Sequence, residues 1–351
     1  MKKISSLFSK LFILVCCCFI LFSCSKDSKS DSVSVAVFVP GIMADSPVYA
    51  MLAQGVEEGI DEFNSNITEG NLVSVTILEA GTNQSEWPGK ITALAATGKY
   101  DVIISSNPSL PDIVEPLTKQ FPKQKFIILD AFYENNENIA TVRYNQREQS
   151  YLTGYIAALV SSAKDEMKYS NAENKIGLIA AQEYPVMNNI IYPGFVEGAQ
   201  EAVPGTTVDF RIVGNWYDAT KGAELAKSMY KNGIDVILPI CGGASQGVIA
   251  AAKEMGFYIT WFDNNGFSKA PGYIVSSSVM AQKRMAKEIT MDYLNNLTEF
   301  GSAKTVGIRE GYIDFIQDDP EYIKNIPEDI RKKMETVVSS IKDGSLLLPS
   351  L

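Results

Sequence analysis

The side chains best suited to ligand chemistry lie directly after apolar, β-branched runs of the chain. Asp130 follows one run, Asp263 and Asn264 follow another, and Asn107 follows a third. A carboxylate accepts hydrogen bonds and an amide both donates and accepts them, so this set suits a ligand with hydroxyl and amide groups. Parallel strands end together at one edge of a sheet, and ligands bind beside that edge in open α/β folds. We therefore expect these residues to line a binding site.

The composition excludes the commonest catalytic mechanisms. The 351-residue sequence contains no histidine, which is the commonest general base and a common ligand of transition metals. Ser-His-Asp, Cys-His and histidine–metal mechanisms are therefore impossible, and the sequence has no phosphate-binding glycine loop of the Walker or dinucleotide type. We expect a protein that is not an enzyme and has no metal or catalytic cofactor. Carboxylates that face each other across a cleft beside a scissile substrate would reopen the enzyme hypothesis.

The amino-terminal segment has the pattern of an export signal. Lys2, Lys3 and Lys10 precede an apolar run at 11–22 that is short for a membrane-spanning helix. The run ends in a lipobox at 21–24, which predicts a lipoprotein signal peptide at 1–23, diacylation of Cys24 and a flexible tether at 24–32. The alternative is an ordinary signal peptide that leaves the mature chain free. In either case, we expect the chain to face the periplasm or the cell exterior.

The net charge limits the kinds of partner, and the cysteine content limits the possible disulfides. The formal net charge of −10 becomes −13 when residues 1–23, which carry three lysines and no acidic residue, are removed. This charge argues against nucleic acid and anionic lipid as partners. With Cys24 lipidated, Cys241 is the single free thiol of the mature chain, so no intramolecular disulfide is expected. Its position at the end of a β-type run predicts a small core residue.

Short β-branched runs alternate with amphipathic segments of helical length, a pattern typical of parallel sheets covered by helices. The predicted fold class is α/β, with two doubly wound lobes. Strands are expected at 34–39, 73–79, 102–105, 125–129, 140–142, 175–180, 207–213, 236–240, 258–262 and 273–277. Helices are expected at 48–63, 87–97, 111–120, 148–161, 190–202, 220–232, 244–255 and 282–297, and a last helix within 327–351 should pack on the second lobe.

Four stretches of the chain share the pattern of one known family. They are FPKQKFIILDA at 121–131, GFVEG at 194–198, YKNGIDVI at 230–237 and GGASQGVI at 242–249. Together they resemble the basic membrane protein family, which contains the purine nucleoside receptor lipoproteins. The resemblance extends over nearly the whole mature chain and implies a type I periplasmic-binding-protein fold that serves an ABC importer. The implied partners are a small-molecule ligand, an ABC permease and an ATPase, and the receptor itself is expected to be a monomer.

In such a fold, two lobes close on a ligand about a hinge that the chain crosses three times. We expect the crossings near Arg143, Gly266 and Gly307. The first lobe would then comprise residues 33–142 and 267–306, and the second would comprise 143–266 and 307–351. A ligand that contacts both lobes only in the closed form shifts the population toward that form, which lets an importer distinguish loaded from empty receptor.

The first loop departs from the motif of the family's nucleoside receptors. Those receptors have Asp-x-Ser-Phe-Asn, in which the aromatic ring stacks on the base. Here the motif begins at Asp45, but Val48 stands at the Phe position and Tyr49 at the Asn position. The resemblance therefore implies the fold more strongly than it implies a nucleoside ligand.

Other site positions of the family are mostly retained. Asp130 matches the strand-end aspartate associated with the sugar, Trp216 matches the second stacking aromatic residue, and Gly243 and Asp263 match the remaining glycine and aspartate. Met280 stands where the family usually has a lysine. A ligand without a phosphate group would not need that lysine.

These departures indicate a larger and more apolar slot, formed by Tyr49, Trp216, Tyr217 and Met280, which would suit an isoalloxazine ring. The first loop is also similar to that of a riboflavin-binding branch with this fold, so riboflavin is the expected transported ligand. Tyr49 and Trp216 are the candidate stacking faces. FMN and FAD should bind less well because they carry phosphate.

The polar parts of riboflavin need partners as well. The amides of Asn107, Asn188 and Asn264 are expected at the pyrimidine-dione edge, since an amide both donates and accepts. Asp130 and Asp263 are expected to accept hydrogen bonds from the ribityl hydroxyls, because a buried hydroxyl without a partner is costly.

Each of these residues also has a structural alternative. The two stacking aromatic residues could be packing residues, and the two strand-end aspartates could cap the following helices. Asn188 could cap the helix expected from residue 190, and Gly243 could serve a tight turn. Trp87 and Trp261 are interpreted as structural residues, at a helix start and within a buried strand respectively.

Three functions therefore remain open. A riboflavin-binding lipoprotein of an ABC importer is the leading hypothesis, and a purine nucleoside receptor of the same family is the first alternative. A ligand-responsive signalling lipoprotein or an adhesin with the same fold is the second alternative. Genes for a permease and an ATPase beside this one would favour transport.

Overall fold

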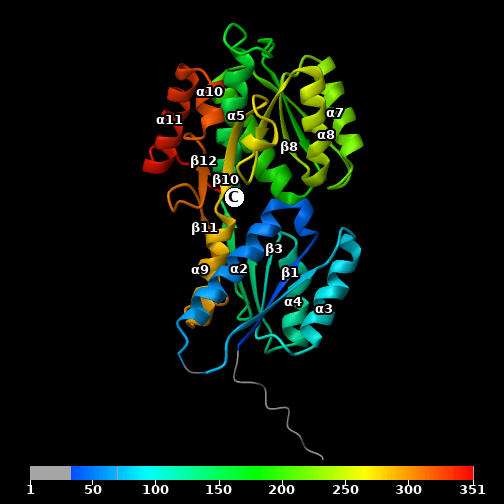
Figure 1. The fold of residues 1–351 in the computed structure, drawn as a ribbon, viewed down its shortest axis with the longest axis vertical. Helices are drawn as coiled ribbons and strands as arrows, with labels where there is room; N and C mark the ends of the chain where they lie inside the picture. The colour runs from blue at the N-terminus through cyan, green and yellow to red at the C-terminus, as the bar shows by residue number, and fades with distance from the viewer. Residues whose placement is uncertain (1–32, 69, 351) are drawn as a thin grey trace, which may run out of the picture.

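A computed structural model of the chain describes residues 33–68 and 70–350. The predicted signal peptide at 1–23, the lipidation site Cys24 and the tether at 24–32 lie outside these residues. The described part forms two lobes, one above the other in Figure 1, and each lobe is built on a six-stranded sheet. The α/β class expected from the alternation of strands and helices is confirmed.

The first lobe is the lower one in Figure 1, and its sheet has the strand order β11-β5-β4-β3-β1-β2 with all strands parallel. The strands are β1 (Ser34–Val39), β2 (Ser74–Glu79), β3 (Val102–Ser106), β4 (Lys125–Leu129), β5 (Ile139–Tyr144) and β11 (Ala303–Val306). The helices are α2 (Pro47–Ser65), α3 (Trp87–Ala96), α4 (Leu110–Gln120) and α9 (Gln282–Leu294).

The second lobe repeats this arrangement, with the strand order β12-β10-β9-β8-β6-β7 and only β12 antiparallel to its neighbour. The strands are β6 (Lys175–Ala180), β7 (Thr207–Ile212), β8 (Val236–Ile240), β9 (Tyr258–Trp261), β10 (Ile274–Met280) and β12 (Ile313–Phe315). The helices are α5 (Gln146–Ser162), α6 (Tyr192–Ala202), α7 (Ala219–Lys231), α8 (Ser245–Met255), α10 (Pro320–Asn325) and α11 (Glu328–Asp343).

The two sheets correspond strand by strand. Strand β4 holds the same place in the first sheet as β9 holds in the second, β3 corresponds to β8, and β1 corresponds to β6. Asp130 and Asp263, which follow β4 and β9, are therefore equivalent residues of two similar lobes. The two lobes show no obvious repeat in sequence. Their correspondence is visible only in the order in which the strands pair.

The chain passes between the lobes after β5, after β10 and after β11. The expected crossing near Gly266 is wrong, because β10 pairs with β9 in the second sheet, with Ser277 opposite Trp261. The segment 267–280 therefore belongs to the second lobe and not to the first, and the chain crosses near Ala281. Beyond that point, α9 packs on α2 in the first lobe. The strand continues to Met280 because its last residues, 278–280, pair with β12.

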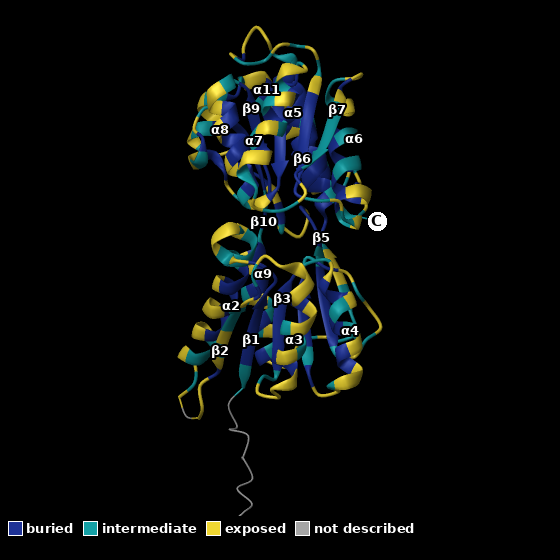
Figure 2. Cartoon of the chain, turned by 90° about the vertical axis from the view of Figure 1, so that its right-hand side faces the viewer, coloured by how far each residue is buried: buried dark blue, intermediate teal, exposed yellow. Residues whose placement is uncertain are grey.

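Helices cover both faces of each sheet, so the central strands are buried and the outer faces of the helices are exposed (Figure 2). Helix α5 is buried along most of its length and packs on both α6 and α11. A Cβ atom built on Gly198 of α6 would lie 2.0 Å from the carbonyl oxygen of Tyr151 in α5. The glycines of the GFVEG stretch therefore allow two helices to approach closely, which gives this family motif a packing role.

Several boundaries differ from the sequence prediction. The short strands β11 and β12 were not expected, because β11 is half-exposed at a sheet edge and β12 has only three residues. A π-helical turn at Met187–Ile191 precedes α6 where the start of an α-helix was expected. Helix α11 packs on α5, as expected for the carboxy-terminal segment. Among the helices of the described residues, none combines the length and apolarity needed to cross a membrane.

Candidate functional site

The candidate site is a cavity of about 360 Å³ between the two lobes, lined by the loops at the carboxyl ends of the strands. This volume lies within the range of about 300–1,000 Å³ that is usual for small-molecule sites. Its lining includes the ends of β1, β3 and β4 from the first lobe and of β6, β8 and β9 from the second. The aromatic lining residues are Tyr49, Trp87, Tyr184, Trp216, Tyr217, Trp261 and Phe262.

Two carboxylates reach the cavity from equivalent places in the two lobes. Asp130 and Asp263 have left-handed backbone conformations, with φ of 54° and 73°, which Asp and Asn tolerate better than most residues do. Gln149 Nε2 donates a 3.2 Å hydrogen bond to Asp263 Oδ1. Asp130 forms no side-chain hydrogen bond with any described residue. Neither carboxylate caps a helix, so the capping alternative is not supported.

Burial and mutual repulsion disfavour ionisation of these carboxylates. Burial raises the pKa of Asp130 to about 8, and the negative charge of Asp263 adds to this shift. Burial also raises the pKa of Asp263, to about 6, although the hydrogen bond from Gln149 opposes the change. Perturbed carboxyl groups in a cleft are typical of functional sites. In an unliganded cavity, Asp130 is therefore largely protonated at neutral pH.

Tyr49 is held by a hydrogen-bond chain in the first lobe. Asn107 Oδ1 accepts from the backbone N–H of Ser109 at 2.9 Å, and Asn107 Nδ2 donates to the Tyr49 hydroxyl at 3.1 Å. Since the Tyr49 oxygen accepts this bond, its own proton is free to donate to a ligand. Burial raises the pKa of Tyr49 to about 12, which keeps that proton in place.

The second lobe supplies a pair of aromatic rings. The rings of Tyr184 and Trp216 have centroids 6.2 Å apart with planes inclined at 42°. Trp216 lies against Gly242, where a Cβ atom would stand 2.9 Å from the Trp216 carbonyl oxygen and 3.4 Å from its Cε3 atom. Gly242 also has a left-handed φ of 55°. The glycine therefore leaves room for Trp216 at this position.

Asn264 is less available than expected. Its Oδ1 accepts a 2.9 Å hydrogen bond from Trp261 Nε1, and its Nδ2 lies 3.3 Å from the carbonyl oxygen of Asn265. The residue lines the cavity but its amide mainly fixes the indole of Trp261. Trp261 itself lines the cavity from the end of β9, so the interpretation of this tryptophan as purely structural is incomplete.

Eight of the predicted ligand-binding residues line the cavity and three do not. Met280 is buried in β10 opposite Ile313 of β12, and only its backbone N–H reaches the site, through a bond to the Asp263 carbonyl. Asn188 is exposed in the π-helical turn and donates to Glu183. Gly243 lies in the turn behind Gly242, which lines the cavity in its place. The eight lining residues are Asp45, Tyr49, Asn107, Asp130, Trp216, Tyr217, Asp263 and Asn264.

The sequence prediction missed Tyr184, Gln182 and Gln146 of the cavity lining. Gln182 and Tyr184 follow β6, so the strand-end rule that identified Asp130 and Asp263 would have found them. Gln146 opens α5 immediately after the first crossing, and its place in the cavity depends on the hinge.

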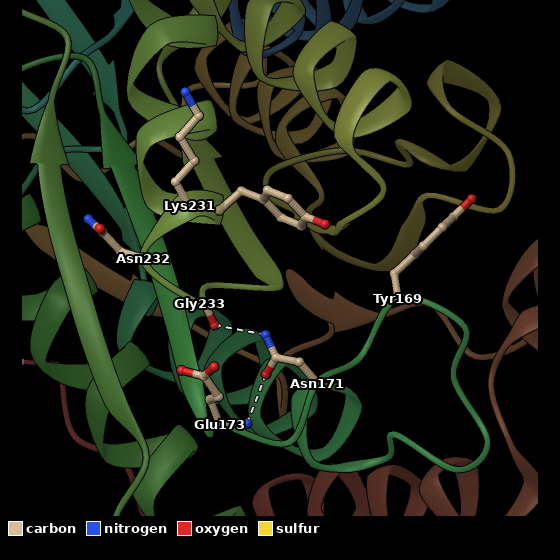
Figure 3. A pocket seen from close by; sticks show the side chains of 7 residues that line it. Tyr169, Asn171, Glu173, Lys231, Asn232 and Gly233 are labelled. Atoms are coloured by element: carbon tan, nitrogen blue, oxygen red, sulfur yellow. Dashed lines mark hydrogen bonds between the residues drawn. The ribbon is translucent and has the colours of Figure 1, made fainter.

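A second hollow lies in the second lobe and is shown in Figure 3. Its volume is larger, about 560 Å³, but Glu173 precedes β6 and Gly233 precedes β8, so it lies at the amino ends of the parallel strands. Its polar groups satisfy one another: Asn171 donates to the Gly233 carbonyl at 2.9 Å and accepts from the Glu173 N–H at 2.8 Å. We therefore place the candidate site between the lobes.

Two similar α/β lobes, three crossings and a cavity between them define the type I periplasmic-binding-protein fold. Solved structures agree. An ABC transporter solute-binding protein from Aeropyrum pernix K1 superposes with a TM-score of 0.77 at 20% identity, covering 91% of this chain and 94% of that chain. One from Bacillus halodurans with bound myo-inositol has a TM-score of 0.58 at 11% identity, covering 87% and 98%.

The sequence narrows this class to one family. Residues 32–345 match the Bmp family, described as ABC transporter substrate-binding protein PnrA-like, and the chain belongs to that family. Basic membrane protein A1 of Borrelia garinii subsp. bavariensis is 27% identical over 350 residues, 97% of this chain and 96% of the relative. The ABC transporter nucleoside-binding protein BmpA of Lactococcus lactis subsp. cremoris is 23% identical over 269 residues, 72% of each chain. The protein is thus an extracytoplasmic substrate-binding protein of an ABC transporter.

Proposed function

We propose that this chain is a membrane-anchored lipoprotein that binds riboflavin between its lobes and delivers it to an ABC permease. One observation carries the proposal. The cavity combines aromatic rings from both lobes with three aspartates, and it has no lysine or arginine among its described lining residues. An uncharged flat ring with a polyhydroxylated chain fits this combination.

The aromatic residues suit the isoalloxazine ring. Tyr49 comes from the first lobe, whereas Tyr184 and Trp216 come from the second. By analogy with base stacking, each stacked face contributes about 1–3 kcal/mol. Because the rings come from different lobes, a ligand between them gains both contacts only when the lobes are closed, so stacking favours closure.

The polar groups suit the rest of the vitamin. The Tyr49 proton and the second N–H of Asn107 are available as donors. The cavity-lining amides of Gln146 and Gln182 can donate and accept, which matches a dione edge that carries both kinds of group. Asp130 and Asp263 can accept hydrogen bonds from ribityl hydroxyls.

The charge of the site argues against phosphorylated ligands. A buried phosphate needs cationic partners, whereas the described lining has three acidic residues, Asp45, Asp130 and Asp263, and no basic one. FMN differs from riboflavin by one phosphate, which would have no cationic partner in this cavity. FMN should therefore bind at least about tenfold more weakly than riboflavin.

A purine nucleoside is the second candidate. It also combines a flat ring with hydroxyls, and a relative with 23% identity is named a nucleoside-binding protein. Nucleoside recognition would leave part of the aromatic lining without a contact.

The test uses protein of residues 25–351, unfolded and refolded to remove any bound ligand. Riboflavin fluorescence is titrated with the protein, with FMN as the matched ligand that adds only a phosphate. We expect saturable quenching at one riboflavin per chain and much weaker quenching of FMN. Absence of quenching at micromolar protein, together with guanosine or inosine binding in calorimetry, would replace riboflavin with a nucleoside.

The membrane anchor has a separate test. Expressed in full with its leader, the chain should incorporate labelled palmitate and sediment with membranes, and Cys24→Ala should abolish both. If wild-type protein incorporates no palmitate and stays in the soluble fraction, the lipoprotein assignment is wrong, and the proposal of riboflavin as the ligand is unaffected.

A further inference from the structure

One buried glutamine holds a carboxylate of the cavity. Gln149 is fully buried in α5, and its Nε2 donates to Asp263 Oδ1 at 3.2 Å and to the Ser278 carbonyl oxygen at 3.3 Å. Both partners are acceptors in this arrangement, so only the NH₂ group of the amide can face them. The orientation of the Gln149 side chain is therefore fixed by the Ser278 carbonyl, independently of any ligand.

Asp263 has few other constraints. Its backbone is in the left-handed region, its carbonyl accepts from the Met280 N–H, and its side chain lines the cavity. Because Gln149 occupies Oδ1 as a donor, the remaining oxygen, Oδ2, is the one left for a ligand. The described ionisable groups that interact with Asp263 are Asp130 from the first lobe and Tyr184 from the second.

The helical turn at 145–149 follows the first crossing directly and is bonded to the segments of the other two crossings. The N–H of Asn145 donates to the Val306 carbonyl at 2.7 Å, and Glu148 Oε2 accepts from the N–H of Ile308 at 2.7 Å. Gln149 is bonded to Ser278, close to the crossing at Ala281. The turn at 145–149 thus joins the hinge to the cavity.

We infer that Gln149 is a positioning residue of the ligand site: it holds Asp263 as a hydrogen-bond acceptor directed at the ligand and links that carboxylate to the hinge. Gln149 does not line the cavity, so it acts through Asp263. The inference rests on the proposed function in that it assumes a ligand with hydroxyl groups bound between the lobes.

The binding test compares Gln149→Met with Thr153→Val. Met keeps the length of the side chain and removes its donor. Thr153 belongs to the same buried network: its hydroxyl donates to the backbone carbonyl oxygen of Gln149 and lies 2.8 Å from Ser278 Oγ. It forms no hydrogen bond with Asp263. We expect Gln149→Met to weaken riboflavin binding at pH 7 by about tenfold, the effect of one hydrogen bond to a charged group. Thr153→Val should change it less than about twofold.

The pH profile separates positioning from general damage to the fold. The bond from Gln149 lowers the pKa of Asp263, so its removal should move the acid limb of the binding curve to higher pH. Gln149→Glu keeps the shape and adds repulsion, so it should move the limb further in the same direction, and it replaces Gln149→Met if that variant does not fold. Equal losses of affinity in Gln149→Met and Thr153→Val, or an unmoved acid limb, would overturn the inference.

A measurement without ligand keeps this inference distinct from the proposed function. The loss of unfolding free energy in Gln149→Met should grow as pH rises through 6, where Asp263 ionises. In the Asp263→Asn background, the same loss should not depend on pH. If wild-type protein fails to bind riboflavin but this pattern appears, riboflavin is wrong and the positioning role stands. A pH-independent loss in both backgrounds refutes the role whatever the ligand is.

Discussion

Asp130→Asn should make the unliganded protein more stable while weakening its binding. Asn tolerates the left-handed backbone at this position, so the change removes the ionisable group with little strain. In the folded protein, burial raises the pKa of Asp130 to about 8, whereas an unfolded chain has about 3.9 for the same group. A raised carboxyl pKa means that the folded state binds more protons between these values, so stability falls as pH rises from about 4 to 8.

The magnitude follows from this difference. Each pH unit within the window costs about 1.4 kcal/mol, which gives an upper bound of about 4 kcal/mol at pH 7. Because the side chain is partly exposed to the cavity and water screens the repulsion there, we expect about 2–4 kcal/mol. Asp130→Asn should recover that amount and lose affinity for riboflavin, because the carboxyl group can ionise on binding to accept charge-assisted hydrogen bonds from the ligand, whereas an amide cannot.

The assay is urea unfolding of ligand-free wild type and variant at pH 5, 6, 7 and 8. The difference between the two proteins cancels the titration of groups that do not interact with Asp130, and it should grow with pH at a slope that approaches 1.4 kcal/mol per unit. Asp263→Asn is the comparison, and its gain should stop growing with pH above about 6. A constant difference between wild type and Asp130→Asn across this range would refute the reasoning.

Three further predictions concern the cavity lining. Trp216→Leu should weaken riboflavin binding by about 1–3 kcal/mol in fluorescence titration, whereas Tyr217→Leu, at a side chain 55% exposed, should have a smaller effect; equal effects would contradict the stacking role of Trp216. Gly242→Ala should cost about 1–2 kcal/mol of stability in urea unfolding, because residue 242 has a left-handed φ. The new Cβ should also crowd Trp216 and weaken riboflavin binding, and unchanged binding would contradict this coupling. The Cys241 thiol, whose pKa burial raises to about 11, should resist a disulfide reagent at pH 8 until the protein of residues 25–351 is unfolded, and rapid native labelling would show that the thiol is accessible.

Most strands could be predicted from sequence because a buried strand leaves a local pattern, a short apolar run between turn residues. The strands β1, β4, β6 and β8 are continuous apolar runs between turn residues, as strands covered on both faces must be. Strands β11 and β12 were missed because one is half-exposed at an edge and the other is very short. Their formation depends on partners far away in the sequence.

The candidate site was predictable to the extent that it follows from strand ends. Asp130 and Asp263 were found because each directly follows an apolar run, and the same rule applied to β6 would have added Tyr184. Met280 was placed in the site by its alignment with a family position, but its side chain is buried in the hydrophobic core. The sequence around Met280 does not show whether this side chain faces the cavity or the core.

The sequence by itself determined the α/β class, the strand ends that carry polar residues, the absence of histidine chemistry and the resemblance to a family of receptors, because each depends only on neighbouring residues or composition. The tertiary structure alone decided which lobe holds β10, which aromatic residues share a cavity, and that Gln149 supports Asp263 across 114 positions of sequence. Those facts depend on pairing between distant strands and on the approach of two lobes, which no local pattern encodes.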